Sequence, residues 1–253
     1  MRKYLSILTR GGKAYNAYPF RILFTLLNSI LIVAILTGIW SHFVEGDPTE
    51  FLRYFVISEF IILGTWVATS TENMYEQTLT QGWNYLFLKP VRLPLGFLAY
   101  GIGYNLIDLV VQVVAAYIVL GMTGFVPQLS QIILLPVVLI IIWLYDFVEG
   151  YMISGLSYYT YELWGFNVVW NTFSDVFGGG MVPLWAFPTW AQNMLNYLPF
   201  PFRRYYLTMF LLSGDISYLV TGIMGMLFWG VFFGLIGYLL HTFGWKRFES
   251  QGG

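Results

Sequence analysis

Residues 22–40 read ILFTLLNSILIVAILTGIW, an apolar run without a charged residue. A helix needs about 20 apolar residues to cross the roughly 30 Å hydrocarbon core of a bilayer, and this run is long enough. A secretory signal has a shorter apolar core followed by a small-residue cleavage site, and no such site follows Trp40. The run therefore predicts a helix that stays in the membrane.

The composition of the whole chain also favours a membrane protein. Of the 253 residues, 58% are hydrophobic and only 10% are charged, whereas soluble domains have about 25% charged residues. The net charge is -1 and the 12 cations are scattered, which argues against a nucleic-acid partner. Since the chain has no cysteine and its two histidines, His42 and His241, lie far apart, no metal site is expected.

The apolar blocks predict six spanning helices in one all-α integral membrane domain that covers residues 1–253. The predicted spans are residues 20–43, 51–70, 95–121, 131–155, 156–182 and 216–243. The fifth span is polar and aromatic, and only a short turn near Gly155 separates it from the fourth.

Residues 1–19, before the first span, mix cations with apolar and aromatic side chains. This mixture is typical of a helix that lies in the plane of the lipid headgroups. Gly11 and Gly12 interrupt the pattern, so an unstructured basic leader is the alternative.

The distribution of Lys and Arg near the span ends predicts the orientation. The predicted cytoplasmic side receives Arg2, Lys3, Arg10, Lys13, Arg21, Lys89, Arg92, Lys246 and Arg247, and the outer side receives Arg53, Arg203 and Arg204. Both termini and the loop at residues 71–94 are therefore expected in the cytoplasm.

Two longer segments join the predicted spans. In the inner loop, residues 71–94, Pro90 and Pro94 forbid one continuous helix, and the loop either docks onto a partner protein or connects two spans at the membrane surface. The outer segment, residues 183–215, is apolar but rich in proline, which predicts short re-entrant helices in the outer leaflet or a simple interfacial loop. Its expected interfacial anchors are Trp185, Trp190 and Tyr197, with Arg203 and Arg204 at the headgroups.

Polar residues within the predicted spans are candidates for a translocation path, because ionisable groups at bilayer depth usually face the bundle interior or water. These residues are Glu59, Asn105, Asp108, Gln112, Asp146, Glu149, Asn167, Asn171 and Asp175. Their spacing places them in stripes on helix faces. They could line a route, form hydrogen bonds between helices, or, for Asp108, Asp146 and Glu149, relay protons.

Four short motifs together carry a family resemblance. They are the basic leader through residues 15–20, LFLKPVRLPL at 86–95, the fifth span ending in glycines 178–180, and PLWAFPTWAQNMLNYLPF at 183–200. With them, the chain resembles a permease subunit of the type-2 ABC exporters. More narrowly, it resembles the bacterial branch with a Leu-Arg-Pro-like element in the inner loop, which is represented here by Leu88, Lys89 and Pro90, with Lys in place of Arg.

The resemblance implies a six-span permease with an N-terminal interfacial helix and a re-entrant outer segment, in the inner membrane of a prokaryote. The inner loop would form a coupling helix that fits a groove on a separate ATPase subunit, and the implied contact residues are Glu76, Gln81, Trp83, Asn84, Lys89, Pro90 and Arg92. Two permeases, identical or different, would pair with two ATPases. ATP and Mg would bind to those partners, with no cofactor on this chain, whose RGGKAY segment at 10–15 cannot be a Walker motif.

The aromatic, weakly charged spans suit a hydrophobic or amphipathic cargo such as a drug, an antibiotic or a lipid. The sequence offers no recognisable catalytic nucleophile, so a membrane subunit without catalytic activity is expected. The alternative function is an ion- or proton-coupled carrier or channel that acts alone through its intramembrane carboxylates.

Overall fold

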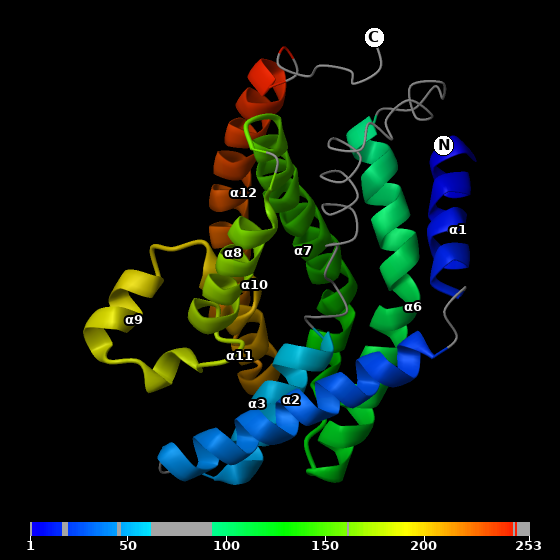
Figure 1. Ribbon diagram of the computed structural model, residues 1–253. Helices are drawn as coiled ribbons and strands as arrows, with labels where there is room; N and C mark the ends of the chain where they lie inside the picture. The colour runs from blue at the N-terminus through cyan, green and yellow to red at the C-terminus, as the bar shows by residue number, and fades with distance from the viewer. Residues whose placement is uncertain are drawn as a thin grey trace.

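The computed structural model describes residues 2–16, 20–44, 47–61, 93–160, 162–244 and 246. All regular structure in these ranges is helical (Figure 1). In chain order the elements are α1 (Arg2–Asn16), α2 (Arg21–Phe43), α3 (Pro48–Val56), η1 (Ile57–Ile61), α6 (Leu93–Met122), α7 (Leu129–Gly155), η2 (Leu156–Tyr158), α8 (Trp164–Phe177), η3 (Leu184–Ala186), α9 (Thr189–Leu195), α10 (Phe200–Arg203), α11 (Tyr205–Ser213) and α12 (Ile216–Gly244).

Four helical stretches in the described residues are long and apolar enough to cross a membrane. They are Arg21–Phe43, Pro94–Met122, Leu129–Tyr158 and Ile216–Gly244. These bounds confirm the first, third, fourth and last predicted spans as long apolar helices. In Figure 1, α6, α7 and α12 stand roughly upright while α2 runs across them.

The second predicted span is described only in its first half. Asp47 caps α3 by accepting a hydrogen bond from the Thr49 backbone N–H at 2.9 Å. The Thr49 hydrogen bonds also lower the pKa of the exposed Asp47 carboxyl below its ordinary value. The helix then continues as the π-helical turn η1 to Ile61, and residues 62–70 lie outside the described residues.

The fifth predicted span, residues 156–182, is not a single helix in its described part. It begins with the 3-10 turn η2, and α8 follows with only 14 residues, which corresponds to about 21 Å at 1.5 Å per residue. The chain ends α8 at Gly178 and turns at Gly179, whose φ of 88° is open to glycine at little cost. The apolar and aromatic composition of residues 156–182 predicted one full span, because composition does not show where a helix begins or ends.

Helix α1 packs alongside α6 rather than standing apart as a surface helix (Figure 1). The two backbones meet where Gly11 faces Tyr100 and Gly103 faces Leu8, and a Cβ on either glycine would overlap the opposite backbone. The glycines that seemed to interrupt an interfacial helix therefore allow α1 to approach α6 closely. The position of α1 in the headgroup plane stays a prediction.

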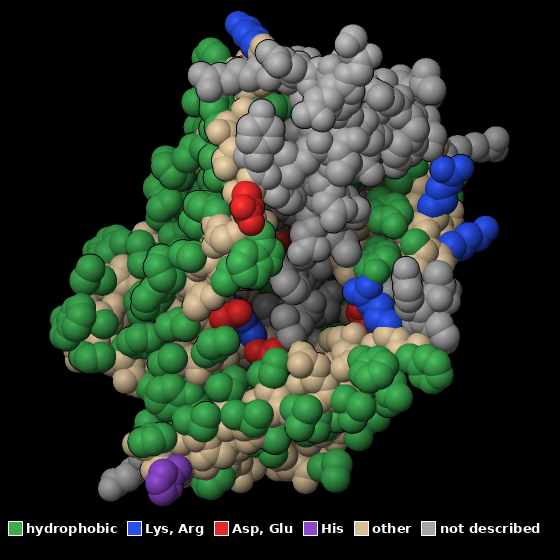
Figure 2. Space-filling model, viewed as in Figure 1, with side chains coloured by type: hydrophobic (Ala, Val, Ile, Leu, Met, Phe, Trp, Pro, Cys, Tyr) green, Lys and Arg blue, Asp and Glu red, His purple; other side chains and the backbone are tan. Residues whose placement is uncertain are grey.

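The long helices α7 and α12 also pack against each other, and glycines again mark the closest contacts. Gly237 lies against Met152, while Gly230 and Gly234 lie against Tyr145 and Val148 of α7. The space-filling view shows hydrophobic side chains over most of the visible exterior (Figure 2). An apolar exterior is the expected surface of a protein whose solvent is lipid.

The outer segment forms the short elements η3, α9, α10 and α11, and prolines stand at the starts of η3, α9 and α10. Short helices are what its sequence predicts, and their position in the outer leaflet stays a prediction. Its last helix, α11, buries Leu207, Phe210 and Leu211 in the core. Trp190 and Tyr197, by contrast, are 68% and 81% exposed. The segment is thus fixed to the bundle by α11 and presents its aromatic side chains outward around α9.

Candidate functional site

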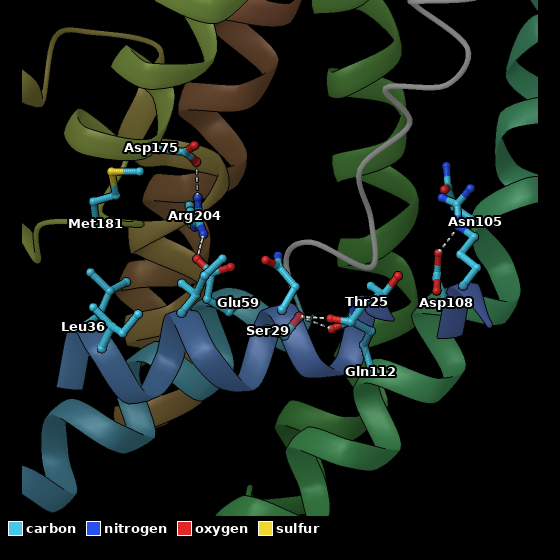
Figure 3. A pocket seen from close by; sticks show the side chains of 14 residues that line it. Thr25, Ser29, Leu36, Glu59, Asn105, Asp108, Gln112, Asp175, Met181 and Arg204 are labelled. Atoms are coloured by element: carbon cyan, nitrogen blue, oxygen red, sulfur yellow. Dashed lines mark hydrogen bonds and ion pairs between the residues drawn. The ribbon is translucent and has the colours of Figure 1, made fainter. Parts of the chain in front are cut away.

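A cavity of about 480 Å³ lies between α2, η1, α6, α8 and the junction of α10 and α11. We refer to it as the central cavity. Figure 3 shows the side chains that line it. The lining residues are Arg21, Thr25, Asn28, Ser29, Ile32, Ile35, Leu36, Glu59, Asn105, Asp108, Gln112, Asp175, Met181 and Arg204.

Arg204 lies at one wall of the central cavity and links three elements. Its guanidinium forms ion pairs with Glu59 of η1 and Asp175 of α8, and its Nε donates to Ser58 Oγ at 2.9 Å. Figure 3 shows Glu59 and Asp175 on opposite sides of Arg204. Gly180 makes room for this arrangement, because a Cβ at that position would overlap the guanidinium.

The burial of Arg204 makes these ion pairs important for the fold. Arg204 is only 4% exposed and Glu59 is equally buried. A buried charge without a partner is strongly unfavourable, and removal of one partner from a buried pair typically costs about 3–5 kcal/mol. We call Arg204, Glu59, Asp175 and Ser58 the Arg204 cluster.

A second ion pair lies at the other end of the central cavity. Arg21, the first residue of α2, contacts the Asp108 carboxylate of α6 at 3.5 Å. Its guanidinium also lies 4.4 Å from the ring centroid of Tyr104 and donates a hydrogen bond to the Tyr104 hydroxyl. This contact fixes the start of α2 against α6.

The polar stripe predicted on residues 105–112 faces inward. Asn105, Asp108 and Gln112 are all buried and all line the central cavity. Gln112 Oε1 accepts a hydrogen bond from Ser29 Oγ of α2 at 3.4 Å, while Asn105 Nδ2 donates to its own helix at Gly101 O. The i, i+3 and i+7 spacing thus brings three polar groups to one wall.

The remaining wall of the central cavity is apolar. It consists of Ile32, Ile35 and Leu36 of α2 together with Met181, which follows α8. Trp40 Nε1 donates to the Met181 carbonyl at 2.8 Å and so holds this segment against α2. In Figure 3, Met181 and Leu36 lie on the opposite side of the cavity from Asn105 and Asp108. The cavity therefore combines polar walls with an apolar wall.

A separate ion-pair network lies outside the lining of the central cavity. Arg203 Nη1 contacts Asp146 Oδ1 at 2.6 Å and Glu149 Oε2 at 3.4 Å, and Nη2 donates to Ser174 Oγ at 3.2 Å. Glu149 also accepts from Trp170 Nε1 at 3.0 Å. The predicted pairing of Asp146 and Glu149 on one face of α7 thus provides the counter-charge for Arg203.

The placement of Arg203 and Arg204 at the lipid headgroups was wrong. Both guanidinium groups point into the bundle and are held by carboxylates on α7, α8 and η1. The physical reason is charge balance, because the intramembrane carboxylates need cations and this pair supplies them. Figure 2 shows basic and acidic side chains together in the hollow above α2.

The structure does not bring together every residue predicted for the path. Of the stripe on α8, only Asp175 reaches the central cavity, while Asn171 is exposed and Asn167 half-buried. The three carboxylates of the predicted proton relay also separate: Asp108 lines the cavity, whereas Asp146 and Glu149 do not. Each set has its own arginine.

The predicted coupling residues lie outside the described residues. They are Glu76, Gln81, Trp83, Asn84, Lys89, Pro90 and Arg92, within the undescribed range 62–92. Their assignment to an ATPase contact stays a prediction.

Several polar residues in or beside the central cavity were not predicted from the sequence. They are Arg21, Thr25, Asn28, Ser29, Ser58 and Arg204. The surplus of intramembrane carboxylates was a usable signal for the arginine partners, since each buried carboxylate requires a cation or a proton. No comparable signal pointed to the hydroxyl and amide groups of α2, which are common in spanning helices.

The side chains of the central cavity suit the binding of a small molecule. Within the described ranges, no group of three or more His, Asp or Glu side chains could hold a metal ion. The cavity instead offers fixed charges, amides and an apolar wall, which are features of a site that receives a small molecule.

Comparison with known protein families gives one match. The model of a family described as "ABC-2 family transporter protein" matches residues 49–252, which is most of the chain. No curated protein matches the chain closely enough to add a named relative. The long apolar helices, the cavity between them and this match agree: the chain is a multi-pass membrane protein and belongs to the ABC-2 family of transporter proteins, the membrane subunits of ABC transporters.

Proposed function

We propose that this chain is the permease subunit of an ABC exporter that moves a hydrophobic or amphipathic compound, such as a drug, an antibiotic or a lipid. ATP hydrolysis on a separate subunit would drive the movement. The family match, which makes the chain an ABC transporter permease, is the observation that carries the proposal.

The central cavity supports the amphipathic character of the cargo. Its walls combine charged and amide groups on α6 and the Arg204 cluster with the aliphatic side chains of Ile32, Ile35 and Leu36. A purely hydrophilic cargo would place its own polar groups against the apolar wall, where they find no hydrogen-bond partner. A purely apolar cargo would offer no hydrogen bond to the amides that line the cavity. A cargo with both kinds of surface satisfies both walls.

The inner loop at residues 71–94 is the proposed contact with the ATPase. The side chains expected at this contact include Glu76 and Trp83, in a stretch rich in aromatic and amide groups. ATP binding and hydrolysis in the partner would move this loop and so shift the permease between inward-open and outward-open states. Both termini would lie in the cytoplasm, in accord with the positions of Lys and Arg.

A second permease subunit is expected to complete the transporter, either a second copy or a similar chain. The proposed assembly is therefore two permeases and two ATPases in the inner membrane of a prokaryote. ATP and Mg would bind to the ATPases.

Co-purification tests this function directly. The full chain should co-purify with a co-expressed partner ABC ATPase, and ATPase activity should appear with the partner and not with this chain alone. An ATPase subunit with its Walker-A lysine replaced is the matched control. ATP hydrolysis by the purified chain alone, or failure to associate with any co-expressed ABC ATPase, would contradict the proposal.

A further inference from the structure

Among the described residues that line the central cavity, the charges do not balance. Arg21 and Arg204 contribute two positive charges, and Glu59, Asp108 and Asp175 contribute three negative ones, so the formal sum over these residues is -1. Within the Arg204 cluster, one guanidinium pairs with two carboxylates, so the cluster itself has a formal charge of -1.

The two carboxylates of that cluster differ in accessibility. The Glu59 side chain is 6% exposed, whereas that of Asp175 is 39% exposed. Asp175 is therefore the carboxylate that a molecule within the cavity can approach without displacing Glu59. In Figure 3, Asp175 lies on the same side of the cavity as Met181 and Leu36, which form part of its apolar wall.

The amide of Gln112 also lines the cavity. Gln112 is 2% exposed, and its Oε1 accepts a hydrogen bond from Ser29 Oγ. Its Nε2 amide group can donate to an acceptor on a bound molecule.

We infer that the central cavity binds an amphipathic organic cation, with its positive group beside Asp175 and its apolar part against Met181 and Leu36. The inference rests on the proposed function and names the cargo class of the same site. The positive group neutralises the surplus carboxylate, and the neighbouring aliphatic side chains remove the apolar part from water. The Gln112 amide can donate a hydrogen bond to an acceptor on the molecule.

A pair of ions of similar size and opposite charge tests the inference. Binding of tetraphenylphosphonium and of tetraphenylborate is measured separately by equilibrium dialysis on the full chain in lipid nanodiscs, with binding to empty nanodiscs subtracted. We expect saturable binding of the cation. Asp175→Asn should weaken that binding about tenfold or more, because it removes the surplus charge in a low-dielectric site, and it should not weaken binding of the anion.

Two further variants keep the test decisive. Asp215→Asn makes the same chemical change at an exposed residue outside the cavity lining and should leave cation binding unchanged. Leu36→Trp narrows the central cavity at its apolar wall and should weaken cation binding without any change of charge. Saturable cation binding that Asp175→Asn leaves unaltered, or the absence of saturable cation binding to the wild-type chain, would overturn the inference.

This experiment needs neither ATP nor an ATPase. Its failure would therefore reject the cationic cargo and leave the permease function standing. A chain that binds the cation at Asp175 but never associates with an ATPase would instead reject the proposed function and retain the binding site.

Discussion

Arg204 and Glu59, far apart in the sequence, form a buried ion pair that joins the outer segment to the end of α3 and η1. Both residues are 4% exposed. Asp175 of α8 completes the contact from the other side of the guanidinium. One side chain thus connects three elements around the central cavity, and its loss should affect stability and cargo binding together.

Replacement of Arg204 by Met should destabilise the protein strongly. The substitution leaves Glu59 buried without its cation, and breaking a buried pair in this way typically costs about 3–5 kcal/mol. Thermal unfolding in nanodiscs would show the loss. Arg204→Lys should recover only part of it, because an ammonium group lacks the fork that reaches Glu59 and Asp175 at once.

A matched control for this prediction is Arg53→Met. Arg53 is half-buried, but it donates hydrogen bonds to the Thr123 hydroxyl and carbonyl rather than to a carboxylate. Its loss should cost about 0.5–1.5 kcal/mol, or somewhat more for a charged donor. If Arg204→Met were as mild as Arg53→Met, the assigned ion pairs would be contradicted.

Asp108→Asn and Asp146→Asn should act independently of each other. Asp108 pairs with Arg21 and Asp146 with Arg203, in networks that have no residue in common within the described part of the chain. Changes at sites without shared partners usually add within about 0.3–0.5 kcal/mol. The measurement is a double-mutant cycle on thermal stability, with transport followed in parallel.

A proton relay through Asp108 and Asp146 predicts a different result. Either single variant would then abolish transport in a correctly folded protein, and the second substitution would add nothing. This outcome would favour the alternative function, an ion- or proton-coupled carrier. It would also contradict the separate networks described for Arg21 and Arg203.

Gly103→Ala should separate α1 from α6. The new Cβ would overlap the carbonyl of Leu8, which is backbone and cannot move without shifting α1. Overpacking of this kind costs about 1–3 kcal/mol. Protease digestion of the N-terminal segment should become faster, and thermal stability should fall.

Gly121→Ala is the control on the same helix. A Cβ at Gly121 meets no atom within 4 Å, so the change should be neutral or should stabilise the helix by about 0.5–1 kcal/mol. Equal effects of the two substitutions would mean that α1 does not pack on α6 as described.

Much of the helical framework could be predicted from the sequence. The apolar runs around residues 22–40 and 216–243 have the length and uniformity that a spanning helix requires, and α2 and α12 follow them closely. The inward position of Asp108 also followed from the spacing of its polar neighbours and the cost of a charge in lipid. These properties are local, and a single sequence contains them.

The pairing of charges could not be predicted in the same way. Arg203 and Arg204 stand beside aromatic residues at the end of an apolar segment, a pattern that also describes headgroup anchors. Their burial depends on where α10 meets α7, α8 and η1, and this is a long-range property of the fold. The role of Gly11 is similar, because a glycine that breaks a surface pattern can equally permit close helix packing.

Trp83→Ala in the inner loop should uncouple ATP hydrolysis from transport without preventing membrane insertion. A few side chains, often aromatic, contribute most of the binding energy of an interface. Truncation of such a side chain to alanine costs about 2 kcal/mol or more. Glu76→Ala should act in the same direction. ATPase activity and transport would be measured together on the reconstituted complex.

Trp190→Ala in α9 provides a matched control, because Trp190 is a 68% exposed tryptophan of the outer segment. Coupling should survive that substitution. Unchanged coupling in both Trp83→Ala and Glu76→Ala would remove the ATPase contact from the inner loop.

We propose that this permease moves its cargo only when another subunit hydrolyses ATP. The most direct measurement is efflux of tetraphenylphosphonium from proteoliposomes that contain the purified chain, with and without its ABC ATPase and ATP. We predict efflux only when the ATPase and ATP are both present, and its loss when the ATPase cannot hydrolyse ATP. Transport driven by an ion gradient with the chain alone would contradict the account.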